Sequence, residues 1–219
     1  MKEQVKIVYQ GGQGEIIEKK SRFICTVLAV NTEEEAIKYI EKIRKQYWDA
    51  RHNCFAYVIG ERQQIQRCSD DGEPSGTAGK PMLEVLLGKN LSNVLVVVTR
   101  YFGGTLLGTG GLVRAYQRST QAGLENSVVF EKCLGKQVSI STDYNGIGKL
   151  QYIAATMDLH TLDTEYTDKV VVELLVPDEQ VNEMGKKVTE ATSGRAKIEI
   201  GDTVYYGIHD GDVIMLDER

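Results

Sequence analysis

Proline and long apolar segments are both scarce in this chain. Only 3 of its 219 residues are proline, whereas 22 are glycine, which predicts tight turns rather than stiff linkers. No apolar run approaches the roughly 20 residues of a membrane-spanning helix, and residues 1–14 lack the apolar core of a signal peptide. We therefore expect a cytoplasmic protein with no membrane partner. An apolar fraction of 42% and a net charge of −5 argue against a disordered chain.

Cysteine is also scarce, and its spacing is typical of neither zinc sites nor redox motifs. The four residues, Cys25, Cys54, Cys68 and Cys133, form no CxxC pair and have no histidine at zinc-ligand spacing. We expect buried free thiols rather than disulfides, a metal site or a catalytic thiol. Nothing in the sequence calls for a metal ion or an organic cofactor, so we expect none.

The small net charge conceals an uneven distribution. Residues 1–135 have a net charge of +3, and residues 136–219 have a net charge of −8. A polyanionic partner should therefore prefer the first part. The acidic second part fits either a docking surface for a protein or a simply solvated surface.

Residues 1–135 predict an α+β domain with about four strands and three helices. The apolar run 93–99 predicts a fully buried strand. Asn31-Thr32, followed by three glutamates, predicts a helix start. The apolar stripe of that helix is expected at Ala36, Ile37, Ile40 and Ile43. Further strands are expected at 21–30, 54–59 and 65–68, and further helices from 82 and over 112–124.

Residues 136–219 predict a second domain with the element order β-α-β-β-α-β, the ferredoxin-like arrangement. Its strands are expected at 136–140, 161–166, 169–176 and 195–200. Its helices are expected at 144–158 and from Pro177-Asp178 to Thr192. Leu134-Gly135 is the natural boundary, which divides the chain into domains at 1–135 and 136–219.

The most informative segment is the glycine-rich stretch from Thr99 to Tyr116. A buried strand runs into a glycine loop and then directly into a helix, and the free N–H groups of a helix start bind anions. Three arginines lie nearby, which predicts a phosphate-binding cradle; the alternative is that the glycines only permit close packing. The candidate residues are Arg22, Arg100, Gly103, Gly104, Gly110, Gly111, Arg114 and Arg118, with Tyr101 and Phe102 available to stack on a base.

Two common nucleotide-binding motifs do not fit this chain. From Gly108 the sequence places Val113 where GxGxxG requires its third glycine. Near Gly79-Lys80, prolines replace both the first glycine and the hydroxyl residue of a P-loop. We therefore do not expect an ATP-type site.

The loop from Asp70 to Lys80 is a second candidate site. Its carboxylates Asp70, Asp71 and Glu73 could hold Mg²⁺ or position a water, or they could cap turns and pair with an arginine. Its other polar residues, Ser75, Thr77 and Lys80, could contact an anion. His52, just before a buried strand, is a candidate acid–base group because histidine titrates near neutral pH.

Four sequence blocks together resemble a known family. They are Lys20-Ser21-Arg22-Phe23, Ala50-Arg51-His52-Asn53, residues 70–79 and the run Arg100-Tyr101-Phe102-Gly103-Gly104 with its continuation to Gly108. This set resembles the signature of the IMPACT family, whose bacterial members are the YigZ-like proteins. The blocks cover most of residues 19–124. The second part is similar to the smaller C-terminal domain of that family in pattern and size.

The resemblance implies a fold and a biological setting. It implies that the first domain is similar to a fold shared by a ribosomal small-subunit protein and domain IV of elongation factor G. It implies that the second is similar to the ferredoxin-like domains of that factor. Eukaryotic relatives, which have an extra RWD domain, damp an amino-acid-starvation response by competing for a scaffold protein that activates a translation-inhibiting kinase. The resemblance implies no enzymatic activity, and this chain starts almost directly at the shared domain.

Three functions are therefore consistent with the sequence. The first is a monomeric cytoplasmic protein that binds RNA or the ribosome and modulates translation under stress, with the cradle residues contacting phosphate. The second is an enzyme that acts on a phosphorylated small molecule, with His52, Asp70, Asp71 and Glu73 in metal or acid–base roles. The third is a regulator that binds a protein partner in translational control without binding nucleic acid.

Overall fold

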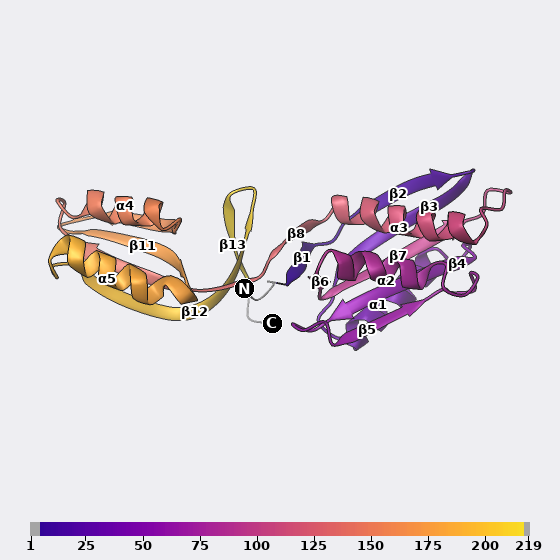
Figure 1. Ribbon diagram of the computed structural model, residues 1–219, viewed down its shortest axis with the longest axis horizontal. Coiled ribbons are helices and arrows are strands. Elements are labelled where there is room, and N and C mark those ends of the chain that lie inside the picture. Colours follow the sequence, from indigo (N-terminus) through magenta and orange to yellow (C-terminus); the bar gives the residue numbers. More distant parts are fainter. Residues whose placement is uncertain (1–4, 217–219) are drawn as a thin grey trace. The chain divides into compact units, whose positions relative to one another are not determined.

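The computed structural model describes residues 5–216, which form two compact units of α+β structure (Figure 1). The division falls between Glu131 and Lys132. The expected boundary at Leu134-Gly135 lies slightly later, inside strand β9 (Cys133–Thr142). Each unit has its own apolar core. No helix in residues 5–216 has the length and apolar character needed to cross a membrane.

The first unit is built on a five-stranded antiparallel sheet with the order β2-β3-β7-β4-β5. The expected strands are all present, and β4 and β5 form the hairpin that the sequence predicts. The bounds are β2 (Gln13–Glu18), β3 (Ser21–Ala29), β4 (His52–Ile59), β5 (Ile65–Ser69) and β7 (Val94–Tyr101).

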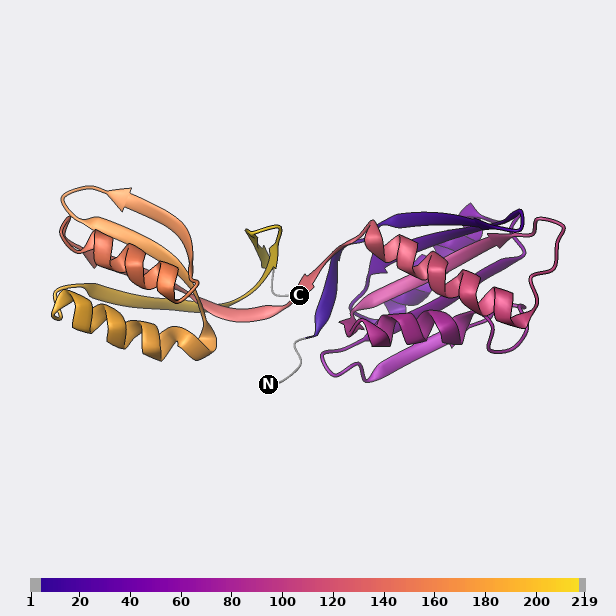
Figure 2. The same ribbon diagram turned by 45° about the horizontal axis from the view of Figure 1, so that its top comes forward.

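Residues 94–98 of β7 are all apolar because helices cover both faces of the sheet. Val94, Val96 and Val98 pack with α2 (Gly79–Gly88) and α3 (Thr109–Glu125). Leu95 and Val97 point to the opposite face and pack against α1 (Glu33–Gln46). Figure 2 shows α2 and α3 side by side on one face of this sheet. The prediction of a fully buried strand is confirmed, and this strand ends at the glycine loop.

Two expectations for the first unit are wrong. The unit has eight strands rather than about four, because β1 (Lys6–Gln10), β6 (Leu91–Ser92) and β8 (Val128–Glu131) form a small second sheet and β2 is an additional edge strand. Strands β1, β2 and β8 are partly exposed, so their sequences have no strong apolar alternation, and β6 is buried but has only two residues. Ile37 is 50% exposed and lies outside the buried stripe of α1.

The second unit has the expected element order followed by one further strand. Its antiparallel sheet has the order β10-β11-β9-β12-β13, and α4 (Ile147–Thr156) and α5 (Val181–Thr192) share one core with it. The remaining bounds are β10 (His160–Tyr166), β11 (Val170–Pro177), β12 (Lys197–His209) and β13 (Asp212–Leu216).

The end of the second unit differs from the prediction. Strand β12 does not stop near residue 200 but continues through an irregularity between Ile200 and Thr203. It then turns at Asp210-Gly211, which both have positive φ, and pairs with β13. The sequence does not predict that the strand continues, because the middle of β12 is exposed and irregular and its Gly201 and Asp202 are typical of a turn.

Candidate functional site

Asp70 has a structural role at the start of α2. Its carboxylate accepts hydrogen bonds from the backbone N–H groups of Gly76, Ala78 and Gly79, at 2.8, 3.0 and 2.8 Å. Burial favours the protonated acid, but these three donors outweigh it and hold the pKa of Asp70 below its usual value. The predicted capping role is therefore confirmed for Asp70.

Asp71 ties the same loop to the sheet and orients a histidine. Its carboxylate accepts from the backbone N–H of Asn53 at 2.7 Å and from Arg44 at 2.6 Å. Its carbonyl oxygen lies 2.9 Å from Nδ1 of His52. Because a carbonyl can only accept, Nδ1 is the protonated nitrogen, and a neutral His52 presents Nε2 as an acceptor. No cluster in residues 5–216 gathers three acidic, histidine or cysteine side chains at metal-binding distance.

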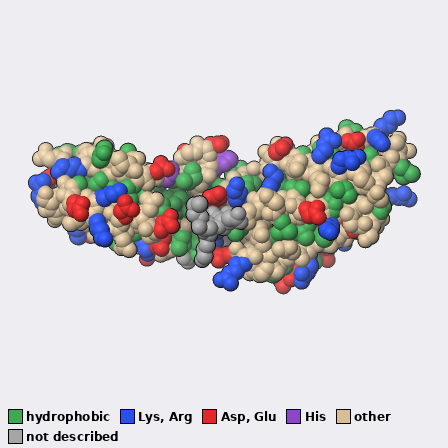
Figure 3. Space-filling model, viewed as in Figure 1, with side chains coloured by type: hydrophobic (Ala, Val, Ile, Leu, Met, Phe, Trp, Pro, Cys, Tyr) green, Lys and Arg blue, Asp and Glu red, His purple; other side chains and the backbone are tan. Residues whose placement is uncertain are grey.

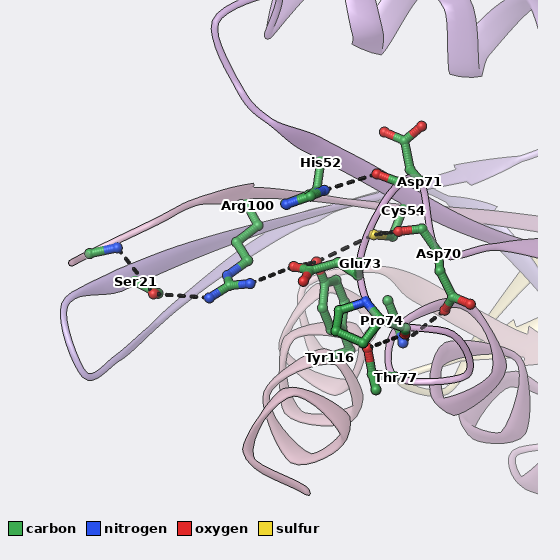
Figure 4. Close-up of polar contacts among 12 residues, drawn as sticks. Ser21, His52, Cys54, Asp70, Asp71, Glu73, Pro74, Thr77, Arg100 and Tyr116 are labelled. Atoms are coloured by element: carbon green, nitrogen blue, oxygen red, sulfur yellow. Dashed lines mark hydrogen bonds and ion pairs between the residues drawn. The ribbon is translucent and has the colours of Figure 1, made fainter. Parts of the chain in front are cut away.

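Glu73 lies at the centre of a buried polar network (Figure 4). Its Oε1 accepts from Nη1 of Arg100 at 2.6 Å and from the hydroxyl of Tyr116 at 2.8 Å. Sγ of Cys54 lies 3.3 Å from the Tyr116 oxygen. Burial raises the pKa of both Tyr116 and Cys54, so these groups stay protonated. Glu73 therefore pairs with an arginine, as one of the sequence interpretations predicts, and Cys54 is not an activated nucleophile.

A phosphate-binding arginine on an open cradle would extend into solvent, but Arg100 does not. The residue is 6% exposed and its guanidinium lies between Glu73 and the Ser21 hydroxyl (Figure 4). The rings of Phe23 and Phe102 flank it, with centroids at 5.4 and 5.7 Å. Its buried Nε has no hydrogen-bond partner in the described part of the chain. The expectation that Arg100 directly neutralises a polyanion is corrected, because its charge is already paired inside the domain.

A pocket of about 410 Å³ lies beside this network, and we call it the α3 pocket. Arg100 and Glu73 are among the residues that line it, and His52 lies at its edge beside the exposed Arg51. Most of the lining is apolar. The lining residues are Arg51, His52, Glu73, Pro74, Arg100, Phe102, Leu106, Leu107, Gly108, Thr109 and Leu112.

At the start of α3, Gly108, Thr109 and Leu112 line the α3 pocket, whereas Gly111 lines a separate small hollow. Helix α3 begins at Thr109, three residues earlier than predicted, so Gly110 and Gly111 are its second and third residues. Gly108 precedes it with φ 72° and provides no side-chain cap. No hydrogen bond within residues 5–216 occupies the N–H groups of these first three helical residues. Arg114 lies alongside, with Nη1 3.6 Å from where a Cβ on Gly110 would be. Arg114 therefore lies beside the start of α3, and its role in anion binding stays a prediction.

Basic side chains gather on the other side of the α3 start. Lys19, Arg114 and Arg118 line a small hollow of about 100 Å³ together with Glu18. Lys20 and Arg22 are exposed on the same hairpin, and Figure 3 shows Lys and Arg side chains concentrated at this end of the first unit. We call Lys19, Lys20, Arg114 and Arg118 the basic surface. Its Arg118 forms an exposed pair with Glu18 at 3.0 Å, whereas Arg22 pairs with Glu15 at 2.8 Å on the opposite face of the sheet, the face that α1 covers.

The arginines of the predicted cradle thus lie in three places. Arg100 belongs to the wall of the α3 pocket, Arg114 and Arg118 belong to the basic surface, and Arg22 lies on the face of the sheet that α1 covers. The sequence interpretation did not include Lys19 and Lys20 as binding residues. They form a two-residue turn with φ 45° and 68°, where Asn-Gly is the usual sequence, so no turn motif indicated that they project together.

The other residues predicted to contact a ligand differ in whether their binding groups are free or already used inside the domain. Gly103 packs on the Lys20–Ser21 peptide, and its N–H donates to the Ser21 hydroxyl, so this amide is not free for a phosphate. Gly104 has φ 84° and open space around it. Phe102 is 48% exposed, whereas the Tyr101 hydroxyl donates to Asp49.

In the loop before α2, the Thr77 hydroxyl donates to the carbonyl of Pro74 at 2.6 Å, and the residue is buried. Its hydroxyl is therefore used inside the loop rather than offered to an anion. Ser75 and Lys80 are exposed, but neither lines the α3 pocket or the small hollow. The structure therefore does not join these two residues to the start of α3.

Two family models match the sequence. The Impact N-terminal domain matches residues 19–124, and a domain of unknown function, DUF1949, matches residues 140–195. The first match contains the α3 pocket and the basic surface. The second covers both helices and strands β10 and β11 of the second unit.

Several known proteins are similar to this chain. IMPACT family member YvyE of Bacillus subtilis is 45% identical over 198 residues, which cover 90% of this chain and 91% of that protein. IMPACT family member YigZ of Escherichia coli is 34% identical over 82% of this chain and 89% of that protein. Protein IMPACT of Mus musculus is 37% identical over 98 residues, which cover 42% of this chain and 30% of that protein.

A solved structure has a similar length and fold. A crystal structure described as that of a hypothetical protein matches with a TM-score of 0.58 and 31% identity, and covers 92% of this chain and 98% of that chain. The matching family models, and relatives that align over most of their own length, agree with the four sequence blocks, three of which contribute residues to the α3 pocket. The chain belongs to the IMPACT family.

Proposed function

We propose that this protein binds RNA through the basic surface and modulates translation in association with the ribosome. The observation that supports this is the concentration of four exposed cationic side chains, Lys19, Lys20, Arg114 and Arg118, at the end of the first unit where α3 begins. Exposed ion pairs such as Arg118–Glu18 contribute only about 0–1 kcal/mol, so a phosphate can replace the carboxylate at little cost. The translational role comes from what the family resemblance implies.

The fold is compatible with this proposal. The order β10-β11-β9-β12 with two helices on one face supports a ferredoxin-like assignment for the second unit, extended by β13. We propose, on the family resemblance, that the first unit shares the fold of the ribosomal-protein domain and of elongation factor G domain IV. Such a pairing of domains suits a protein that approaches ribosomal RNA.

The enzyme interpretation has less support. Asp70, Asp71 and Glu73 all have structural partners, which leaves His52 as the candidate with an available nitrogen at the α3 pocket. The interpretation as a protein-binding regulator predicts that the acidic second unit, rather than the basic surface, determines association. The experiment below separates it from RNA binding.

The test is co-sedimentation with ribosomes and anisotropy with a labelled single-stranded RNA over a salt series. The variant is Lys19→Glu/Arg118→Glu, because charge reversal at the buried Arg100 would break the Glu73 pair instead of testing the surface. We expect at least about tenfold weaker RNA binding, since each charge-assisted hydrogen bond contributes about 1.5–3 kcal/mol. The salt slope should fall by about 0.7 for each phosphate that the variant no longer binds.

The matched control is Arg62→Glu, at an exposed position in the β4–β5 turn. That turn lies beside the first residues of β7, whereas the basic surface lies beyond its last residues, about 25 Å away at 3.3 Å per residue. Circular dichroism checks that both variants are folded. Equal binding by the wild type and Lys19→Glu/Arg118→Glu, or equal loss in the control, would contradict the proposal.

A further inference from the structure

We propose that the RNA bound at the basic surface is single-stranded, and that one of its unpaired bases stacks on Phe102 at the α3 pocket. This inference rests on the proposed function and names the class of RNA that the site accepts. It makes the apolar part of the α3 pocket a second half of the interface. A double-stranded RNA would contact only the cations, because its bases are paired and stacked inside the duplex.

The α3 pocket leaves large apolar side chains open to solvent. Phe102 is 48% exposed and Leu106 is 83% exposed, and both line the pocket together with the half-buried Leu107. We call these three residues the apolar wall. Single exposed apolar side chains are ordinary on protein surfaces, but neighbouring ones that line the same pocket indicate a surface that another molecule covers.

The apolar wall is continuous with the basic surface. Leu107 lines both the α3 pocket and the small hollow of the basic surface. Gly103, which directly follows Phe102, packs against the backbone of Lys20. One ligand can therefore contact the cations and the apolar wall at the same time.

Cations lie on both sides of Phe102. The sheet order places β7 between β3 and β4, and Phe102 directly follows the last residue of β7. The Lys19-Lys20 turn precedes β3 and Arg51 precedes β4, so their charges lie on either side of that strand end. Arg51 lines the α3 pocket and forms no ion pair with a described residue. This succession of positive charge, aromatic ring and positive charge complements a nucleic-acid strand, in which negative phosphates flank each base.

The ring of Phe102 is held in place before any ligand binds. The buried guanidinium of Arg100 lies between the rings of Phe23 and Phe102, 5.7 Å from the centroid of the second. The N–H of Gly103 donates to the hydroxyl of Ser21 at 3.1 Å, which fixes the backbone directly after Phe102. A ring that is already fixed loses little rotamer freedom when a base stacks on it, so more of the stacking free energy contributes to affinity.

The test is fluorescence anisotropy of the full chain with two labelled RNAs at physiological salt. One is an unstructured oligouridylate of about ten nucleotides, within the usual length range of single-strand sites, and the other is the same strand in a blunt duplex with its complement. The duplex has the higher charge density, so a purely electrostatic surface would bind it at least as tightly. We expect the single strand to bind at least about fivefold more tightly, which is the lower limit for one base stacked on an aromatic side chain.

Substitutions of Phe102 separate stacking from charge. Phe102→Leu keeps an apolar side chain and should weaken single-strand binding at least about fivefold, with an unchanged salt slope and unchanged duplex binding. Phe102→Trp should restore the affinity, and the single strand but not the duplex should quench its additional fluorescence relative to wild type. Ile37→Ala is the matched control, because Ile37 is also half exposed but belongs to α1, which covers the opposite face of the sheet. Circular dichroism checks that each variant is folded.

The outcomes separate this inference from the proposed function. Equal affinity for the two RNAs, or single-strand binding that Phe102→Leu leaves unchanged, overturns the inference, even where Lys19→Glu/Arg118→Glu weakens the binding of both RNAs and so supports the basic surface. An equal loss in Ile37→Ala overturns it as well. If the protein binds neither RNA, the proposed function fails and the inference fails with it.

Discussion

The buried Arg100–Glu73 pair makes the first unit unusually sensitive to removal of either charge. Both side chains are less than 10% exposed, and the charged atoms lie 2.6 Å apart. At an effective dielectric constant of about 20, unit charges about 4 Å apart attract by about 4 kcal/mol. Removal of one partner of a buried pair costs about 3–5 kcal/mol. Glu73→Gln should therefore lower the free energy of unfolding by that amount, although its amide oxygen can still accept from Tyr116.

A double-mutant cycle makes this prediction quantitative. Arg100→Met alone should also cost about 3–5 kcal/mol, whereas Glu73→Gln/Arg100→Met removes both charges and should cost far less than the sum. The assay is urea unfolding followed by circular dichroism. With a slope of about 1.5–2 kcal/mol per molar urea, each single variant shifts the midpoint of the first unit down by about 1.5–3 M. The transition of the second unit should not move.

The exposed Arg118–Glu18 pair is the matched control. Its atoms are 3.0 Å apart, but the side chains are 60% and 34% exposed. Glu18→Gln should therefore cost less than about 1 kcal/mol. If the buried pair behaves like this exposed one, or if the two buried substitutions add without coupling, the reasoning from burial is refuted.

The loops around the candidate site allow three further predictions. Asp70→Asn should cost about 1–2 kcal/mol at pH 7 by urea unfolding. Because the pKa of Asp70 is lowered in the folded protein, this stabilisation is complete above the ordinary aspartate pKa and is lost as the pH falls, so the gap to wild type should narrow below about pH 4. A constant gap would contradict the assignment. Gly103→Ala should destabilise far more than Gly104→Ala in thermal melts, since its Cβ would lie 2.0 Å from the Lys20 backbone, whereas Gly104 has open space and only an unfavourable φ. Equal melting temperatures would show that the loop moves. Lys19→Asn/Lys20→Gly should raise stability by about 2 kcal/mol and lower RNA affinity; unchanged affinity would remove these lysines from the basic surface.

The sequence indicated the parts of the site that depend on local chemistry. The apolar run of β7, the glycines before α3 and the capping aspartate each have a short-range signal, so the strand, the helix start and the role of Asp70 could be predicted. The family resemblance was equally accessible, because the run around Arg100 is specific.

The burial of Arg100 could not be predicted in the same way. An arginine at the end of a strand has the same local sequence whether it faces solvent or a carboxylate 27 positions away. Sequence reasoning correctly assigned Glu73 an arginine partner but did not identify Arg100 as that partner. The edge strand β2 was also missed, because a half-exposed strand needs few apolar residues and depends on pairing with a neighbour.

The Lys19-Lys20 turn has a consequence for the entropy of binding. A two-residue connection is the shortest that joins antiparallel strands, and both lysines have left-handed backbone conformations. The backbone under these two charges is therefore fixed relative to the sheet before any ligand arrives. A polyanion that contacts them restricts side-chain rotamers but does not have to order a loop, and the ordering cost that weakens binding by flexible basic segments is avoided. The unfavourable turn conformation thus lowers the stability of the folded domain, but it also lowers the conformational entropy that is lost when a polyanion binds.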